Sequence, residues 1–369
     1  MDKVRFGIIG VGAMGKAHAQ SFLDGQIKDG VLTAVYDITP SQVDWLKETD
    51  VKIFDSTVDM FKSGSIDAVL VATPHYFHPP LAMEAFHYNL HVMIEKPAGV
   101  YTQQVREMNE AAANADVTFG IMFQQRTNST FQKMRQMVKD GELGELKRTH
   151  WIITNWYRSQ AYYNTSNWRA TWRGEGGGVL LNQCPHNLDL WQWICGMPSK
   201  VTAFCHMGKW HDIEVEDDVS AYVEYPNGAT GVFITCTADA PGTNRFEVTG
   251  DLGKLVYEEG YFDKPSTLEF FRLKQSEREF NKENKEMFGA PAYEHKIIET
   301  GSQYPAHPGA ITAFIDKILG RGAQYATGEE GIHSLMLSNA MHLSSWLGKT
   351  IPLPLDEALF LSELRKRYK

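Results

Sequence analysis

Short apolar runs alternate with helical patterns over the first 123 residues of the chain. The apolar runs cover residues 4–10, 31–37, 51–54, 66–72, 91–95 and 117–123. The helical patterns between them cover residues 13–23, 40–48, 57–63, 78–89 and 102–115. An uninterrupted apolar run such as 68–72 is typical of a strand that is buried on both faces. The alternation therefore predicts an α/β fold, a doubly wound parallel sheet with helices on both sides.

The pattern changes after about residue 123. It predicts a helix near 128–139, a strand at 145–158, a helix from Gly176–Gly178 to about Cys195, successive strands from 199 to 275, and two closing helices near 307–319 and 329–346. Turn residues between the strands indicate a large, mostly antiparallel open sheet. Residues 276–303 are polar and charged and show little periodicity, so we expect a long loop or an excursion there.

A chain of 369 residues is longer than one compact core usually supports, so we expect two domains. The change of pattern places a doubly wound domain at 1–123 and an α+β domain at 124–369. The 43% content of hydrophobic residues excludes a disordered chain.

The charge of the chain narrows the classes of partner. The 36 basic residues stand against 45 acidic ones, and the basic residues form no cluster. This balance argues against nucleic acid and against anionic membrane surfaces as partners. The N-terminus leads straight into an apolar strand without a charged leader, and no apolar run reaches the roughly 18 residues that a membrane span needs.

The cysteines are Cys184, Cys195, Cys205 and Cys236, and no two of them form a Cys-x-x-Cys pair. Cys184 and Cys195 fall on one predicted helix, roughly 16 Å apart at the rise of an α-helix. That distance is too long for a disulfide. A reduced, cytoplasmic protein is therefore the simplest interpretation.

A glycine triplet follows the first predicted strand and begins the first helix. Its residues are Gly10, Val11, Gly12, Ala13, Met14 and Gly15. Gly10 permits a tight turn, Gly12 lets the backbone approach a pyrophosphate, and Gly15 allows the helix to pack closely on the strand. The first N–H groups of the helix then face the anion. The pattern predicts a dinucleotide site, and the alternative is a purely structural turn.

Asp37 ends the second predicted strand, 22 residues after Gly15. An acidic residue there accepts hydrogen bonds from an adenosine ribose and repels a 2′-phosphate. It therefore favours NAD over NADP as the cofactor. The alternative is a cap or turn residue before Pro40.

The ends of three further strands carry candidate site residues. Ala72-Thr73-Pro74-His75 ends the fourth strand, and His78 starts the next helix. Ligands bind outside the carboxyl ends of the strands in open parallel sheets, so we expect these residues near the nicotinamide half of the cofactor. Gln124 and Gln125 follow the last strand and are expected to contact the cofactor and the substrate, respectively. The two histidines are equally consistent with capping or solvent-facing positions.

Glu95-Lys96-Pro97 ends the fifth strand, at the same edge of the sheet. An ammonium group beside a substrate hydroxyl stabilises the alkoxide that develops as hydride leaves. Glu95 is expected to pair with a cation or to hold the cofactor ribose. The alternative for Lys96 is a structural lysine that reaches solvent.

A second group of candidates lies in the predicted helix after Gly176–Gly178. Asn182, His186 and Asp189 are spaced four and three residues apart, so a helix places all three on one face. Pro185 has no backbone N–H to donate within this helix, which predicts a kink or a late helix start. The pKa of histidine lies near neutrality, which suits a general base. A zinc site is the competing hypothesis, but no further histidine cluster has ligand spacing, so we expect no metal.

The segment before that helix is rich in aromatic and cationic residues. The candidates for substrate binding are Tyr157, Trp168, Arg169 and Trp172. Aromatic faces stack on sugar rings, and arginines bond hydroxyl groups. For each of them, a position in the core or at an interface is the alternative.

These motifs, in this order, resemble the glucose–fructose oxidoreductase / inositol dehydrogenase / MocA family. The resemblance covers essentially the whole chain and rests on the glycine triplet, Asp37, Ala72-Thr73-Pro74, Glu95-Lys96-Pro97 and His186-x-x-Asp189. It implies that Lys96 polarises the substrate hydroxyl and that His186 is the acid–base. Many members have aspartate four residues before the histidine, where this chain has Asn182, so His186 is left as the one credible base.

The sequence thus predicts a cytoplasmic NAD-dependent oxidoreductase acting on a secondary hydroxyl of a sugar, glycoside or cyclitol. An NAD-dependent glycosidase that uses transient oxidation, and a non-catalytic sugar or nucleotide sensor, are the alternatives. An open apolar sheet face is rarely left in water, and the resemblance implies a homodimer or homotetramer through the second sheet.

Overall fold

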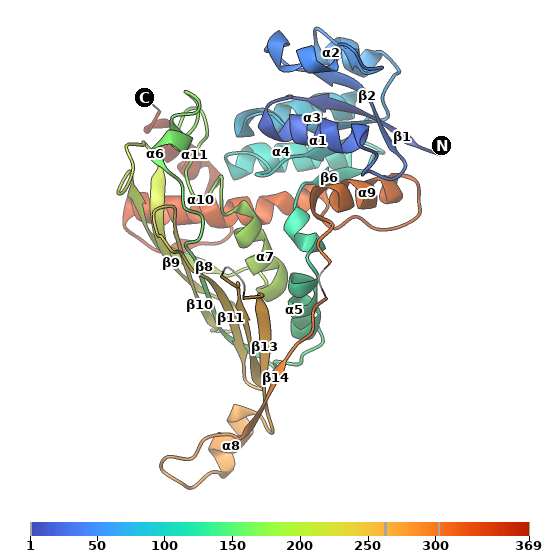
Figure 1. The fold of residues 1–369 in the computed structure, drawn as a ribbon. Coiled ribbons are helices and arrows are strands. Elements are labelled where there is room, and N and C mark those ends of the chain that lie inside the picture. The colour runs from blue at the N-terminus through green and yellow to red at the C-terminus, as the bar shows by residue number, and fades with distance from the viewer. Residues whose placement is uncertain (1, 262–263, 302, 369) are drawn as a thin grey trace. The chain divides into compact units, whose positions relative to one another are not determined.

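The computed structural model describes residues 2–261, 264–301 and 303–368, which form two compact units (Figure 1). The first unit contains the N-terminal residues up to Asn128 together with Gly174–Gly176 and Tyr304–Leu335. The second contains Ser129–Arg173, Gly177–Gln303 and Met336–Lys369. Each unit is therefore discontinuous in sequence. The predicted domain boundary at residue 123 stays a prediction. The two compact units follow a different division, because segments distant in sequence belong to the same unit.

The first unit is built on a six-stranded sheet, which confirms the predicted doubly wound α/β fold. Its strand order is β3-β2-β1-β4-β5-β6, and all its strand pairs are parallel. The strands are β1 Val4–Ile9, β2 Gly30–Tyr36, β3 Lys52–Ile53, β4 Ala68–Val71, β5 His91–Ile94 and β6 Phe119–Ile121. The order reverses between β1 and β4, and a crevice forms at such a switch point.

Helices follow most of these strands, as the pattern predicts. They are α1 Ala13–Leu23, α2 Thr57–Lys62, α3 His78–His87 and α4 Thr102–Ala113. The helix expected at 40–48 is wrong, because this segment forms two short 3₁₀ turns, Pro40–Gln42 and Asp44–Leu46. Within residues 40–46, four side chains are exposed and only Val43 and Leu46 are buried. This segment therefore has no continuous apolar stripe that would support an α-helix.

A helix from the C-terminal part of the chain completes the core of the first unit. The helix α9, Ala306–Ile318, buries Phe314 and Ile315 completely. The ring of Phe6 on β1 lies 6.3 Å from that of Phe314 and 5.0 Å from that of Phe22 on α1. Because this face of the sheet is closed by α9, residues 304–335 belong to the first unit.

The second unit is built on a nine-stranded sheet, mostly antiparallel as predicted. Its order is β14-β13-β12-β11-β7-β10-β9-β8-β15, with one parallel pair, β7 and β10. The strands are β7 Leu146–Ile153, β8 Lys200–Met207, β9 Glu216–Glu224, β10 Thr230–Cys236, β11 Asn244–Gly250, β12 Gly253–Glu258, β13 Thr267–Leu273, β14 Tyr293–Ile297 and β15 Ile351–Pro352.

Helices cover the inner face of this sheet. They are α5 Ser129–Lys139, α7 Pro185–Cys195 and the part of α10 (Gly331–Leu347) from Met336 onward. The short α6, Gln160–Tyr163, lies in the segment before α7. Trp191 of α7 stacks on Phe233 of β10 at 5.4 Å. Ser344 of α10 accepts the N–H of Ala203 on β8 at 2.9 Å. These contacts fix α7 and α10 on the sheet.

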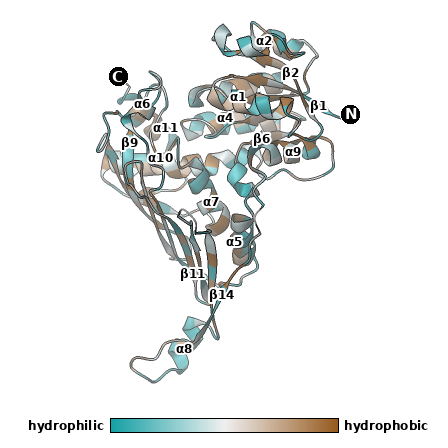
Figure 2. Cartoon of the chain, viewed as in Figure 1, coloured by the Kyte–Doolittle hydropathy of each residue, from teal (hydrophilic) through white to brown (hydrophobic). Residues whose placement is uncertain are grey.

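Two parts of the second unit differ from the sequence prediction. Residues 276–303, expected to be a long loop or an excursion, contain a helix, α8 Glu277–Glu283, and the edge strand β14. Ser276 and Glu279 form a capping box that explains the start of α8. The helix projects at the end of the β13–β14 hairpin and is polar along its surface (Figures 1 and 2). A further helix, α11 Glu357–Arg365, follows the two predicted closing helices.

The outer face of the second sheet carries exposed apolar side chains. Phe204 on β8 is 65% exposed and Tyr222 on β9 is 42% exposed. Ile152 on β7 and Ile234 on β10 pair on the same face. In the described part of the chain, no helix is both long and apolar enough to cross a membrane.

Candidate active site

The glycine triplet forms the turn from β1 into α1, as predicted. Gly10 has a φ of +86°, which favours glycine, and a Cβ on Gly15 would lie 1.8 Å from the carbonyl oxygen of Gly10. A Cβ on Gly12 would meet no atom within 4 Å. Two of the three glycines are therefore required by the fold itself, whereas Gly12 faces open space.

The first turn of α1 presents backbone donors at this space. Gly12 is its N-cap residue and brings no side chain to cap the first N–H groups. Ala13 and Met14 are exposed in that turn. Unpaired N–H groups and the helix dipole together attract a pyrophosphate, so the turn fits the phosphates of a dinucleotide.

Asp37 lies directly beside the glycine turn. Its carboxylate accepts the N–H of Val11 at 2.6 Å and the N–H of Thr39 at 2.8 Å. Asp37 thus shapes the turn, as the structural alternative supposed. Since each oxygen has a second lone pair, the same carboxylate also remains able to accept a ribose hydroxyl.

Thr73 and Pro74 follow the end of β4 and are half-buried. The hydroxyl oxygen of Thr73 is buried without a hydrogen-bond partner among the described residues. A buried polar atom of this kind is costly unless a ligand or water satisfies it. It therefore supports a ligand at the carboxyl end of β4.

The two histidines after β4 are buried, so the solvent-facing alternative is wrong for both. His78 places Nδ1 2.8 Å from the carbonyl oxygen of Pro97 and Nε2 2.7 Å from that of Thr73. Burial lowers its pKa, although the two carbonyl contacts oppose that shift. His75 places Nδ1 3.0 Å from the carbonyl oxygen of Glu175. Contact of either ring with a cofactor stays a prediction.

Lys96 follows β5 and is half-buried. The residue before it, Glu95, forms an ion pair that the sequence did not reveal. Glu95 lies 2.6 Å from Nε2 of His18, with both side chains nearly inaccessible to solvent. The other carboxylate oxygen accepts the N–H of Lys96 at 3.2 Å. Burial alone would raise the pKa of Glu95, but the bond and charge of His18 outweigh it and lower the pKa to about 2.

The partner of Glu95 was missed, although a signal for it existed. His18 is three residues after Gly15, so it shares the buried face of α1 with that glycine. The ring of His307, at the start of α9, lies 5.4 Å from the ring of His18. Burial lowers the pKa of His307.

In the second unit, α7 begins at Pro185 rather than at the glycines. The expectation of Asn182, His186 and Asp189 on one helix face is therefore wrong, because Asn182 lies in turns that precede the helix. Proline suits the first position of a helix, since its missing N–H is not needed there, and it disfavours helical geometry in the residue before it. This explains the late start.

His186 and Asp189 lie in the first turns of α7 and are buried. The carboxylate of Asp189 accepts the side-chain N–H of Gln192 at 3.0 Å. Pro185 and His186 follow Cys184, whose Sγ lies 3.1 Å from the hydroxyl of Thr235 on β10. The start of α7, and with it His186, is thereby attached to the sheet.

Asn182 belongs to a polar network with the aromatic segment. Arg169 donates to the hydroxyl of Tyr162 at 2.7 Å, and that hydroxyl lies 3.4 Å from Oδ1 of Asn182. The guanidinium of Arg169 also lies 4.5 Å from the centre of the Tyr162 ring. Tyr162 was not among the predicted site residues. Its place in a turn of α6, six residues before Trp168, gave no periodic signal.

The other predicted substrate residues divide into exposed and buried positions. Tyr157 is exposed, Trp168 is half-buried, and Gln124 and Gln125 lie in a 3₁₀ turn of the first unit, Gln124–Thr127. Trp172 is only 3% exposed and packs edge-on against two further rings of the second unit, those of His342 and Trp346. The core alternative therefore describes Trp172 better than substrate binding does.

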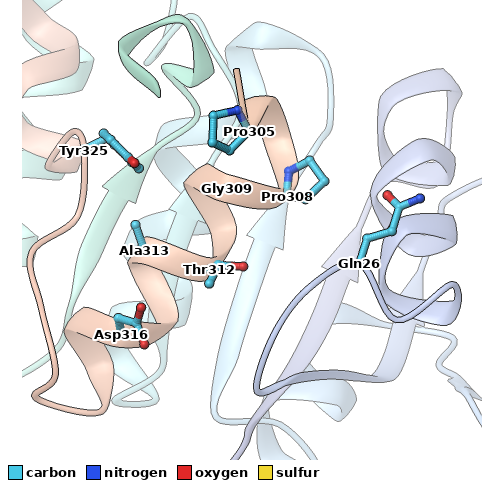
Figure 3. Close-up of a pocket in the computed structure, with 8 residues that line it drawn as sticks. All are labelled: Gln26, Pro305, Pro308, Gly309, Thr312, Ala313, Asp316 and Tyr325. Carbon is cyan, nitrogen blue, oxygen red and sulfur yellow. The ribbon is translucent and has the colours of Figure 1, made fainter. Parts of the chain in front are cut away.

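Each unit has a surface cavity of its own. A cavity of about 460 Å³ in the first unit runs along α9, and none of its eight lining residues belongs to the predicted dinucleotide site (Figure 3). A cavity of about 580 Å³ in the second unit is lined by ten residues that include Tyr163, Arg169 and Asp212. Across the described residues, His, Cys, Asp and Glu side chains form no group of three that could hold a metal ion.

Two family models match the chain in succession. The oxidoreductase family with an NAD-binding Rossmann fold matches residues 4–123. The C-terminal domain of the GFO/IDH/MocA proteins matches residues 131–256.

Characterised relatives and solved structures resemble most of the chain. It is 26% identical to the 1,5-anhydro-D-fructose reductase of Ensifer adhaerens, over 77% of this chain and 79% of that protein. It is also 26% identical to the myo-inositol 2-dehydrogenase of Thermotoga maritima, over 68% of this chain and 74% of that one. The crystal structure of the WlbA dehydrogenase from Bordetella pertussis, in complex with NADH and UDP-GlcNAcA, matches with a TM-score of 0.79 and 26% identity over 96% of this chain and 100% of that chain.

Proposed function

Because this chain belongs to the GFO/IDH/MocA family of NAD-binding oxidoreductases, we propose that it transfers a hydride between NAD and a secondary hydroxyl of a sugar, glycoside or cyclitol. Two features of the same parallel sheet support the proposal most directly. The glycine turn that fits a dinucleotide follows the carboxyl end of β1, and Lys96 follows the carboxyl end of β5. Parallel strands present these ends at one edge, where ligands bind.

The residues of the first unit fit NAD. Gly12 leaves space for phosphates at the start of α1, Asp37 offers a carboxylate to a ribose, and Thr73 has a buried hydroxyl oxygen that needs a partner. When bound, the nicotinamide ring supplies the hydride acceptor or donor. The protein supplies orientation and charge. We infer that Asp37 makes NAD the preferred cofactor.

Lys96 is inferred to act on the substrate oxygen. Its ammonium group would stabilise the negative charge that grows on this oxygen as the C–H bond transfers its hydride. The ion pair of Glu95 with His18 keeps the Glu95 carboxylate charged and fixed through the Lys96 N–H. That arrangement holds the backbone of Lys96 in place at the end of β5.

His186 is inferred to take the hydroxyl proton, and Asn182 to hold a neighbouring hydroxyl. An imidazole can accept a proton near neutral pH, whereas an asparagine amide cannot. The hydroxyl of Tyr162 contacts Asn182, and Arg169 donates a hydrogen bond to that hydroxyl. Both residues are therefore inferred to orient Asn182 and to contact the sugar.

The decisive experiment is a panel of inositols, aldoses and glycosides incubated with NAD or NADP, followed by the absorbance of the reduced cofactor. A dehydrogenase accumulates NADH with at least one member of the panel. Cleavage of a glycoside without net NADH would instead identify the glycosidase alternative. Binding of sugar and NAD without either product would identify a sensor and contradict the proposed reaction.

We also infer that the chain forms a homodimer or homotetramer through the outer face of the second sheet, and that it is cytoplasmic. Phe204 and Tyr222 are exposed on neighbouring strands of this face. Contiguous apolar surface of this kind commonly marks an interface between proteins. The cytoplasmic location rests on the four cysteines, all of which are free thiols in the structure.

A further inference from the structure

A buried carboxylate holds the loop that leads to His186. Glu216 is the first residue of β9 and is fully buried. Both of its carboxylate oxygens lie 2.9 Å from the N–H of Gly178, and one of them accepts the N–H of Leu180 at 3.0 Å. A charged acceptor makes stronger bonds than a neutral one, so this side chain is a firm anchor for the loop.

The backbone of Glu216 contributes to the same anchor. Its carbonyl oxygen accepts the N–H of Val179 at 3.0 Å. Three successive amides, those of residues 178, 179 and 180, therefore bond to one residue. A Cβ on Gly178 would lie 2.0 Å from the carbonyl oxygen of Glu216, so only glycine permits this approach.

A buried histidine contacts the same carboxylate. Nε2 of His342, on α10, lies 3.0 Å from Oε2 of Glu216, and both side chains are inaccessible to solvent. The imidazole stacks on the ring of Trp346 at 5.4 Å and meets the ring of Trp172 edge-on at 5.3 Å. The aromatic rings hold the imidazole within ion-pair distance of the carboxylate, without a hydrogen bond to it in the described structure.

The anchored amides set the course of the chain as far as α7. The carbonyl oxygen of Gly178 accepts the N–H of Asn182 at 2.9 Å, and that of Val179 accepts the N–H of Cys184 at 2.9 Å. Cys184 is the N-cap residue of α7, and His186 is the second residue of that helix. A shift of residues 178–180 therefore moves Asn182 and the start of α7 together.

From these contacts we propose that Glu216, supported by His342, is a positioning residue that sets the place of Asn182 and His186 through the loop 178–184. The proposal rests on the proposed function, because it assigns the effect to the acid–base His186. Neither Glu216 nor His342 reacts with the substrate. Both act through the backbone.

The test combines activity with hydrogen exchange of the full-length protein. In Glu216→Gln, the side chain loses its charge and one of its two acceptor oxygens, so its bonds to the N–H groups of Gly178 and Leu180 should weaken. We expect kcat to fall by about 10–100-fold, as misplacement of a reacting group by about 1 Å does. Exchange of the amides of residues 178–184 should be at least tenfold faster, and the affinity for NADH should stay within twofold of the original.

A double-mutant cycle separates positioning from a general loss of stability. If Glu216 acts through Asn182 and His186, Glu216→Gln should lower the residual activity of the Asn182→Ala/His186→Ala double variant no further, since the effects share one route. Glu216→Asp keeps the charge and should recover part of the activity. Asp251→Asn is the matched control, because Asp251 also accepts a backbone N–H, that of Glu145 at 2.7 Å, in a turn of the same sheet.

Several results would overturn the proposal. These are a kcat within threefold of the original in Glu216→Gln, a further loss on top of the Asn182→Ala/His186→Ala double variant, or unchanged exchange in residues 178–184. Should Glu216→Gln fail to fold, Glu216→Asp and His342→Gln carry the same measurements with the same criteria. If no sugar is oxidised, the proposed function fails, whereas the exchange data still decide whether Glu216 anchors the loop.

Discussion

Lys96 is the residue on which the proposed chemistry depends most directly. In Lys96→Met the side chain keeps a similar length but loses its charge, so the developing oxyanion has no cation beside it. We expect kcat to fall by about 10²-fold or more, while NADH titration by fluorescence shows a nearly unchanged affinity. Lys62→Met, on the exposed end of α2, is the control. Full turnover in Lys96→Met would remove the assigned role.

Asp37 has two roles that a substitution separates. Asp37→Asn removes the charge that repels a 2′-phosphate and keeps one of the two oxygens that accept the N–H groups of Val11 and Thr39. We expect the ratio of kcat/KM for NAD to that for NADP to fall by about tenfold, together with a modest loss of thermal stability from the N–H group that loses its acceptor. An unchanged ratio would show that Asp37 acts only as a turn residue.

The ionisation of Glu95 should make the free energy of unfolding depend on pH in the acid range. Its pKa is lowered to about 2 in the folded chain, so the carboxylate stabilises the fold above its ordinary range near 4.5, and this contribution is lost as pH falls toward 2. The free energy of unfolding of Glu95→Gln should therefore lie below that of the original chain at pH 7, and the gap should narrow below pH 4.5. Urea unfolding over this range measures it.

A control and a contradictory outcome are available for this pH dependence. Glu110→Gln removes an exposed carboxylate on α4, which pairs with Arg106 at the surface, so its gap to the original chain should be small at every pH. A Glu95→Gln gap that stays constant between pH 7 and the acid limit would contradict the ion pair with His18.

At the scale of elements, the turn into α1 distinguishes glycines that the fold requires from one that a ligand requires. Gly12→Ala should keep the melting temperature within about 2 °C, because its φ of −67° suits alanine and no atom lies near the new Cβ. The methyl group should nevertheless weaken NADH binding by about tenfold or more. In Gly15→Ala the clash with Gly10 should lower both stability and binding.

The outcome is read by differential scanning fluorimetry together with NADH titration. Equal loss of stability in the two variants would contradict the assignment of Gly12 to the phosphates. Normal NADH affinity in Gly12→Ala would do the same.

The sequence predicts elements well where one local pattern decides them. The runs in β1, β4 and β5 are mostly apolar, and the strands formed there within one or two residues of the expected bounds. The helix expected from Gly176–Gly178 starts late, at Pro185, as that proline allowed; the turns before it depend on Glu216, which lies far along the chain and accepts the N–H groups of residues 178–180. A hydrogen bond from a distant strand leaves no periodic signal in the segment that it holds.

At the scale of the whole molecule, the outer face of the second sheet should decide the oligomeric state. Replacing Phe204 and Tyr222 together by aspartate places two charges on this face, which should break an apolar interface. Light scattering after size exclusion should then show a smaller mass than that of the original chain. Phe288→Asp is the control, because Phe288 lies between α8 and β14 and is 93% exposed. A monomeric original chain would contradict the inferred assembly.

The sequence by itself determined the doubly wound sheet, the dinucleotide turn and the family, because alternating patterns and a compact motif are properties of neighbouring residues. Only the tertiary structure decided that α9 belongs to the core of the first unit, since the face on which Phe314 packs is supplied by Phe6, some three hundred residues earlier. It also decided the partners of Glu95 and the anchoring of the loop before His186. These depend on which distant side chains a fold brings within bonding distance, and burial without water then makes each such bond obligatory.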